Sequence, residues 1–228
     1  RSARQKALIM LKFIRLALKE MKHNGQPSGR KVPLTPYRRY MVEHMRQAKK
    51  VPSQVLCKEC DFAELAELRK TSASRIGWTA LMIKAYSILA KRQPQLRRIY
   101  QRWPFRYLYE PDRQTCRIVF AREIDQQEEI LFHKLEDPEL MSIMEIQQAI
   151  SFAQHAPIHK IPAFDLHDKF CRLPAIVRKA IWALAPLCPK LRVSMIGTFG
   201  FTTVAREDVA SVHPPSLGNI VVTSGPLQ

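Results

Sequence analysis

The irregular order of helical and strand patterns restricts the possible folds of this chain more than any other feature. Residues 78–92 have the apolar spacing of a long helix, whereas residues 115–124 have the alternation of a strand. Helices and strands do not follow one another regularly, so a doubly wound parallel sheet is not expected. The sequence predicts an α+β fold in which helices pack on a sheet as a two-layer sandwich.

The pattern along the chain predicts seven helices and six strands. Gly, Pro and polar clusters between the apolar segments mark the connections. We expect a Pro- and His-rich loop over residues 156–168. The predicted helices cover residues 5–22, 36–50, 61–70, 78–92 and 138–155, with two short ones within 172–191, and the predicted strands cover residues 53–60, 98–110, 115–124, 129–134, 195–204 and 219–224.

Positive charge is concentrated at the N-terminus. The chain of 228 residues has a net charge of +17, and residues 1–50 contain fourteen Lys or Arg against two acids, which gives 14 − 2 = +12. In the helix at 5–22, basic residues recur on one face at Lys12, Arg15, Lys19 and Lys22. We therefore divide the chain into a basic amphipathic arm and linker at 1–30 and a folded domain at 31–228.

This charge attracts polyanions, and four interpretations of the arm remain open. It is a solvated basic segment, a helix packed on its own domain, a helix that docks on a partner subunit, or a helix that docks on an anionic membrane surface. Sequence-specific nucleic-acid binding is not expected, because no recognised module is present and aromatic residues do not interleave with the basic ones.

The sequence also argues against several other classes. Only 7 glycines are present, and we find neither a phosphate-binding loop nor a dinucleotide fingerprint. Five scattered cysteines indicate reduced thiols and a cytoplasmic protein rather than a disulfide framework. Cys57 and Cys60 lack the second pair that a zinc site requires, so no metal is expected.

Several short segments, in this order, resemble the acyltransferase domain of 2-oxo-acid dehydrogenase complexes, the dihydrolipoamide acyltransferase catalytic domain. Chloramphenicol acetyltransferase shares the fold that this resemblance implies. The insert at 169–192 is more similar to stand-alone members, which lack lipoyl domains. The matching segments are Pro33-Leu34-Thr35-Pro36-Tyr37-Arg38-Arg39, Val51-Pro52, Asp61 with Leu65 and Leu68-Arg69-Lys70, Thr79–Ala85 with Pro94-Gln95-Leu96, Leu140–Ile146, and Gly197–Thr203 with His213-Pro214-Pro215.

The resemblance implies acyl transfer from acyl-CoA, or a related thioester, to a thiol, hydroxyl or amine acceptor. Coenzyme A is then the cofactor, supplied as acyl-CoA, and the site is a channel between the subunits of a homotrimer or a higher assembly of trimers. A histidine in a His-x-x-x-Asp-Gly motif is the general base of this family. Residues 1–228 lack that motif. We expect that the chain is truncated at Gln228 and that the motif lies just beyond it. The alternative is that this protein has lost the motif.

Few site residues transfer from the family. Thr202 aligns with the hydroxyl residue that stabilises the oxyanion, and Thr203 takes this place if the alignment shifts by one residue. Arg38 aligns with the arginine that pairs with the motif aspartate. Gln54 and Leu56 align with strand residues that line the acceptor channel and are therefore predicted to bind substrate.

Six histidines are candidate bases, but none matches the family's base position. We expect His44, His133, His155, His159, His167 and His213 to be structural or exposed.

Two functions of other classes compete with the enzyme hypothesis. A catalytically inactive trimeric scaffold would keep the fold without the base. A basic membrane-surface protein would act through the helices at 5–22 and 172–191, as a peripheral membrane protein. The sequence does not specify the acyl group, the acceptor or the assembly beyond a trimer.

Overall fold

A computed structural model describes residues 30–71, 76–101 and 104–203, together with residues 11–12, 14–16, 19, 214, 217–218 and 220–224. The chain divides into two units, Arg1–Leu34 and Thr35–Gln228. Most of the predicted helix at 5–22 and the linker at 23–29 lie outside the described residues. Within the described part of the chain, no helix is both long enough and apolar enough to span a membrane.

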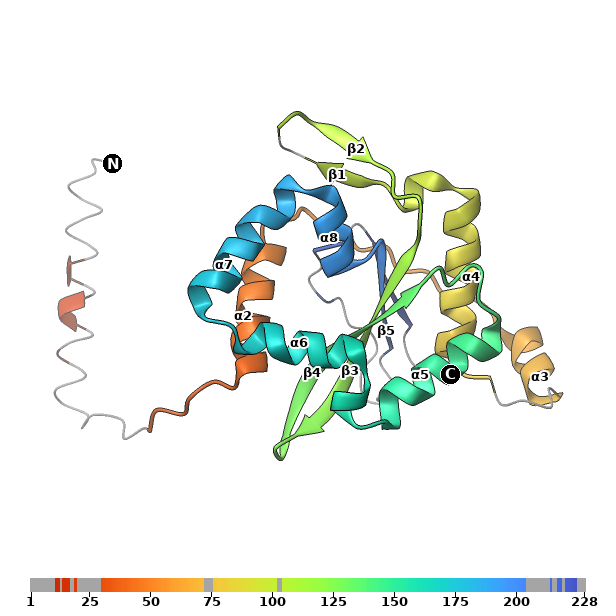
Figure 1. Ribbon diagram of the computed structural model, residues 1–228, viewed down its shortest axis with the longest axis horizontal. Coiled ribbons are helices and arrows are strands. Elements are labelled where there is room, and N and C mark those ends of the chain that lie inside the picture. The colour runs from red at the N-terminus through yellow and green to blue at the C-terminus, as the bar shows by residue number, and fades with distance from the viewer. Residues whose placement is uncertain are drawn as a thin grey trace. The chain divides into compact units, whose positions relative to one another are not determined.

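The second unit combines helices and strands, which confirms the α+β class (Figure 1). Three short 3₁₀ helices, at Pro94–Leu96, Ile158–Lys160 and Ala185–Leu187 (η3), connect the longer elements. The α-helices are α2 (Pro36–Ala48), α3 (Ala63–Thr71), α4 (Trp78–Arg92), α5 (Ile143–His155), α6 (Pro162–Arg172), α7 (Ala175–Leu184) and α8 (Pro189–Ile196). The strands are β1 (Ile99–Gln101), β2 (Tyr107–Tyr109), β3 (Thr115–Ile124), β4 (Gln127–Glu136), β5 (Phe199–Thr203) and β6 (Val221–Ser224).

The main sheet has the strand order β4-β3-β5-β6, and β1 and β2 form a separate antiparallel pair. β3 and β4 form an antiparallel hairpin, while β5 runs parallel to both β3 and β6. The hairpin turns at Asp125 and Gln126, whose φ angles of 51° and 62° are those of a tight turn that follows the strand twist. The end of β3 and the start of β4, on either side of this turn, lie next to the start of α2.

Helices cover the sheet on both sides (Figure 1). On one side, Tyr86 of α4 contacts Phe199 of β5, with ring centroids 4.6 Å apart. On the other side, the Tyr40 hydroxyl of α2 accepts a hydrogen bond from Arg117 of β3. The sheet is therefore buried between helices, with α4 on one side and α2 on the other, while α5 and α6 also pack against β4. Large apolar side chains such as Phe201 are fully enclosed.

Most predicted elements are confirmed within a few residues. The helix at 78–92 and the strand at 115–124 have the predicted bounds. The predicted helix at 138–155 begins only at Ile143, because Ser142 and Glu145 form a reciprocal capping box there. The predicted strand at 195–204 begins at Phe199, because α8 continues to Ile196.

Three predictions of local structure are wrong. The strand predicted over 98–110 is instead two short strands, β1 and β2, which pair antiparallel with each other because the chain turns back between them. Residues 53–60 form no strand; they are an exposed, irregular segment with no strand partner among the described residues. Residues 156–168 are not a loop, because a 3₁₀ turn and most of α6 occupy them. The prolines at 157 and 162 begin these helices instead of preventing them, since a helix's first turn does not use the proline N–H.

Candidate functional site

The first turn of α2 holds Arg38 against the β3–β4 hairpin. Thr35 caps the helix: its Oγ1 accepts a hydrogen bond from the Arg38 N–H at 3.1 Å and donates one to Glu129 Oε1 at 2.5 Å. The Arg38 guanidinium lies 3.8 Å from the same carboxylate oxygen. The Glu129 side chain is 3% exposed and that of Arg38 is 54% exposed. Arg38 thus has a buried carboxylate partner while its head group remains accessible.

A pocket of about 130 Å³ opens beside this turn. Its walls carry two carboxylates, Asp125 and Glu129, and the guanidinium of Arg172. Charged groups of both signs therefore meet at this pocket. The full lining is Thr35, Pro36, Tyr37, Ile124, Asp125, Gln127, Glu129 and Arg172.

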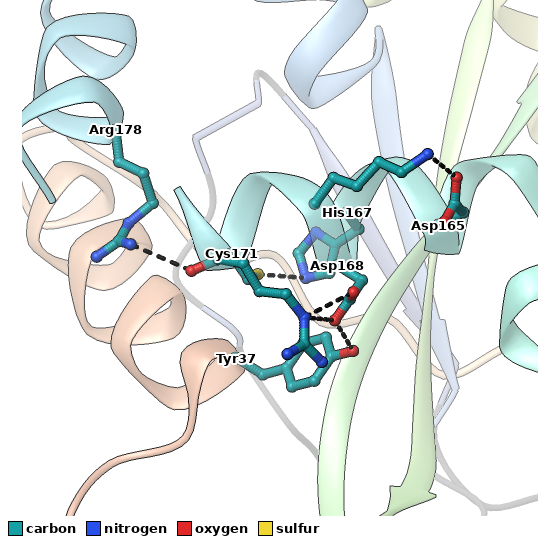
Figure 2. Close-up of polar contacts among 8 residues, drawn as sticks. Tyr37, Asp165, His167, Asp168, Cys171 and Arg178 are labelled. Carbon is teal, nitrogen blue, oxygen red and sulfur yellow. Dashed lines mark hydrogen bonds and ion pairs between the residues drawn. The ribbon is translucent and has the colours of Figure 1, made fainter. Parts of the chain in front are cut away.

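Tyr37 and Arg172 line this pocket, and Asp168 lies beside Tyr37 (Figure 2). The Tyr37 hydroxyl donates to Asp168 Oδ1 at 2.5 Å, and Arg172 Nε donates to both carboxylate oxygens, at 2.9 and 2.8 Å. Burial and the hydrogen bond to Asp168 raise the pKa of Tyr37 above its usual value. Burial alone would raise the pKa of Asp168, but the bonds from Arg172 and Tyr37 hold it below its usual value. Tyr37 therefore remains a proton donor, not a base.

A cluster of basic and aromatic side chains is buried between α2 and the strands β3 and β4. Arg117 donates to Met195 O at 2.7 Å and to the Tyr40 hydroxyl at 3.1 Å, and its guanidinium carbon lies 3.8 Å from the centroid of the Phe132 ring. Burial, and then the charge of Arg117, lower the pKa of both His44 and His167 to about 4. Both imidazoles are therefore neutral at pH 7 and contribute to the core.

The structure places Thr202 inside β5, where it pairs in register with Thr223 of β6. Its side chain is half-buried, and β5 alternates it with the buried Phe201. Thr203 is the last residue of β5 and pairs with Ser224. Arg38 lies against β4, two strands away from β5, so no described contact joins the predicted oxyanion residue to the predicted positioning arginine.

Gln54 and Leu56 lie in the irregular segment between α2 and α3, and both are exposed. Leu56 is 88% exposed. Their predicted strand position is wrong, and their predicted contact with substrate stays a prediction.

The histidines do not form a site in the described part of the chain. His155 ends α5, His159 lies in a 3₁₀ turn and His167 is buried in α6, so the three do not share a loop. Within residues 30–71, 76–101 and 104–203, no group of His, Cys, Asp and Glu is arranged to hold a metal ion. All five cysteines are free thiols. His213 lies outside the described residues.

Sequence patterns did not identify the pocket. Tyr37, Glu129, Asp168 and Arg172 come from three separate elements and are adjacent only after folding. One signal was present for the buried cluster: Arg117 directly precedes the apolar run Ile118–Ala121 of its strand, where a charged residue needs a specific reason.

Comparison with protein families now defines the class. The family model for the 2-oxoacid dehydrogenases acyltransferase (catalytic domain) matches residues 26–171. The match covers well over half of the chain, and it includes α2, the β3–β4 hairpin and all of α6 except its last residue. This chain belongs to that family. Comparison with curated proteins gives no match.

Solved structures show the same fold. A probable dihydrolipoamide acetyltransferase from Listeria monocytogenes 4b F2365 is 16% identical, with a TM-score of 0.56 over 88% of this chain and 76% of that one. The cubic core of the pyruvate dehydrogenase multienzyme complex is 14% identical, with a TM-score of 0.61 over 87% and 73%. A truncated catalytic core of the 2-oxoacid dehydrogenase multienzyme complex from Thermoplasma acidophilum is 14% identical, with a TM-score of 0.60 over 87% and 80%.

Proposed function

We propose that this chain is the core of an acyltransferase that moves an acyl group from acyl-CoA, or a related thioester, to a thiol, hydroxyl or amine acceptor. The family match over residues 26–171 carries this proposal, because acyl transfer is the general chemistry of the family. The net charge of +17 is consistent with a donor that bears the phosphates of coenzyme A.

In this proposal Thr202 donates a hydrogen bond to the oxyanion of the tetrahedral intermediate. Its half-buried position on a strand between two neighbours supports the role, because a rigid strand holds a hydroxyl in one place. Thr203 takes the role if the alignment shifts by one residue. Arg38 positions the partner of the general base, and its accessible guanidinium is free to make that second contact.

The proposed active unit is a homotrimer with a channel between subunits. Two observations support it. The solved relatives include cores of multienzyme complexes. Moreover, Gln54 and Leu56 lie exposed on an extended segment that a neighbouring subunit would cover. This would place the two side chains at the channel wall, where they were predicted to line the acceptor path.

The first test establishes whether a base is encoded. The His-x-x-x-Asp-Gly motif does not occur in residues 1–228, so the codons that follow Gln228 are determined first. A motif there supports the enzyme. A stop codon there, together with a stable trimer that has no turnover with any acyl-CoA, supports the inactive scaffold instead.

The second test measures release of the coenzyme A thiol from acyl-CoA with a thiol reagent. We expect Thr202→Ala in the complete protein to lower kcat by roughly ten- to a thousandfold, the scale for loss of one oxyanion donor. Thr202→Ser retains the hydroxyl and should recover most of the rate. Thr223→Ala, which removes the cross-strand neighbour, is the matched control and should leave kcat unchanged. An unaltered rate in Thr202→Ala rules out the role.

A further inference from the structure

The outer surface of α7 and η3 is apolar and has no covering element among the described residues. Ile176 is 81% exposed and Leu184 is 54% exposed, and Leu187 continues the same face. At helical spacing, these residues lie opposite the buried Arg178 and Trp182. The helix thus has one face that packs on the domain and one apolar face in solvent. We name the solvent face, with Ala180 and Ala183, the α7 face.

The segment that carries the α7 face has charges of one sign. From Lys169 to residue 205 the sequence contains six Lys or Arg and no Asp or Glu. Lys179 and Lys190 are exposed, and no described residue pairs with either of them. An aliphatic surface bordered by unpaired lysines is complementary to an anionic lipid bilayer, which accepts apolar side chains and attracts cations.

A second copy of this chain fits the α7 face less well. Two such faces would bring Lys179 and Lys190 close to their equivalents, and like charges repel. The cores of protein interfaces are also enriched in aromatic residues and depleted in Lys and Ala. Here the one aromatic residue of α7, Trp182, is buried against α2, and the solvent face holds aliphatic side chains and lysine.

We propose that the α7 face docks on an anionic membrane surface. Ile176, Leu184 and Leu187 enter the boundary between headgroups and acyl chains, and Lys179 and Lys190 contact the headgroups. This inference is independent of acyl transfer, because it depends only on the exposure and charge of α7 and η3.

Cosedimentation with vesicles tests the proposal. The full chain is mixed with vesicles of phosphatidylcholine and phosphatidylserine in a 7:3 ratio, or of phosphatidylcholine alone. We expect binding to the anionic vesicles only, and a loss of at least tenfold in affinity for I176D/L184D. For K179Q/K190Q the loss should be roughly 25-fold, since each basic residue at an anionic surface contributes about fivefold. L140D removes an equally apolar, 71% exposed leucine outside the face and should bind as the parent does.

Two further measurements separate the α7 face from the N-terminal arm and report its contact with lipid. In a chain that lacks residues 1–30, I176D/L184D should still lower the affinity for anionic vesicles, because α7 and not the arm contacts the lipid. An environment-sensitive dye on the exposed Cys188, with Cys57 and Cys60 changed to Ser, should shift to the blue on anionic vesicles. Circular dichroism and urea unfolding establish that each variant is folded.

The proposal is overturned if the parent chain does not bind the anionic vesicles, or if I176D/L184D binds them as tightly as the parent. It is also overturned if I176D/L184D dissociates an oligomer in sedimentation velocity while vesicle binding persists, since the α7 face is then a subunit interface.

Discussion

Arg178 joins three parts of the domain, and its removal should be costly. Its guanidinium donates to both oxygens of Glu43 on α2, at 3.0 and 2.7 Å, and to the carbonyl of Leu173 between α6 and α7. It also donates to the carbonyl of Cys171 near the end of α6, at 3.1 Å (Figure 2). The side chains of Arg178 and Glu43 are 4% and 14% exposed. The arginine therefore satisfies a nearly buried carboxylate and the carbonyl groups at the end of α6.

We expect Arg178→Met to reduce the free energy of unfolding by about 3–5 kcal/mol, the usual cost of leaving one member of a buried ion pair alone. For a domain of this size, each kcal/mol lowers Tm by roughly 2–4 °C, so Tm should fall by roughly 6–20 °C. The double variant E43L/R178M leaves no unpaired charge. It should therefore be more stable than Arg178→Met alone.

Urea unfolding followed by tryptophan fluorescence measures these differences, at one fixed protein concentration because assembly affects apparent stability. Lys179→Met is the matched control, since the neighbouring cation is exposed; it should change the free energy of unfolding by less than about 0.5 kcal/mol. A loss below about 1 kcal/mol for Arg178→Met, or a double variant less stable than the single one, would refute the reasoning.

Two other perturbations test the core. Gly197→Ala should cost about 1–3 kcal/mol, because φ is +82° there and a Cβ would lie 2.8 Å from Thr115 O; an unchanged Tm would contradict this. Stability should fall as the pH drops from about 6.5 toward about 4, because the unfolded chain protonates His44 and His167 before the folded chain does. The loss at about pH 5.5 should be on the order of 1 kcal/mol per histidine. Urea midpoints that do not vary with pH would contradict this role of the two histidines. A pH dependence that His167→Gln leaves unchanged would contradict it as well.

Local patterns predicted the elements whose stability is mainly local. The helix at 78–92 follows from its apolar spacing, and α2 follows from Thr35 and Pro36, which cap and begin it. The prediction of a strand at 53–60 was wrong. A strand needs a neighbouring strand to satisfy its backbone hydrogen bonds, and a pattern of side chains does not supply one. The prediction of a loop at 156–168 was wrong because it was based on proline and histidine, which are typical of loops. In the structure, the apolar positions Phe164 and Cys171 give α6 a buried face.

The predicted site residues depend on an alignment with relatives, and only some of them have informative surroundings. Arg38 was identified by its motif, but its contact with Glu129 could not be predicted, since the two residues are far apart in the sequence. The Tyr37–Asp168–Arg172 group has the same origin. No periodicity joins residues of α2 and α6, so their hydrogen bonds appear only when the helices pack.

The sequence by itself determined the α+β class, the positive charge and the family resemblance, because composition, spacing and short motifs are properties of neighbouring residues. The tertiary structure decided which side chains meet: Arg178 with Glu43, Arg117 with Tyr40, and an apolar face of α7 left in solvent. The physical reason is that burial and ion pairing depend on distances in space. Folding fixes these distances between segments that lie far apart along the chain.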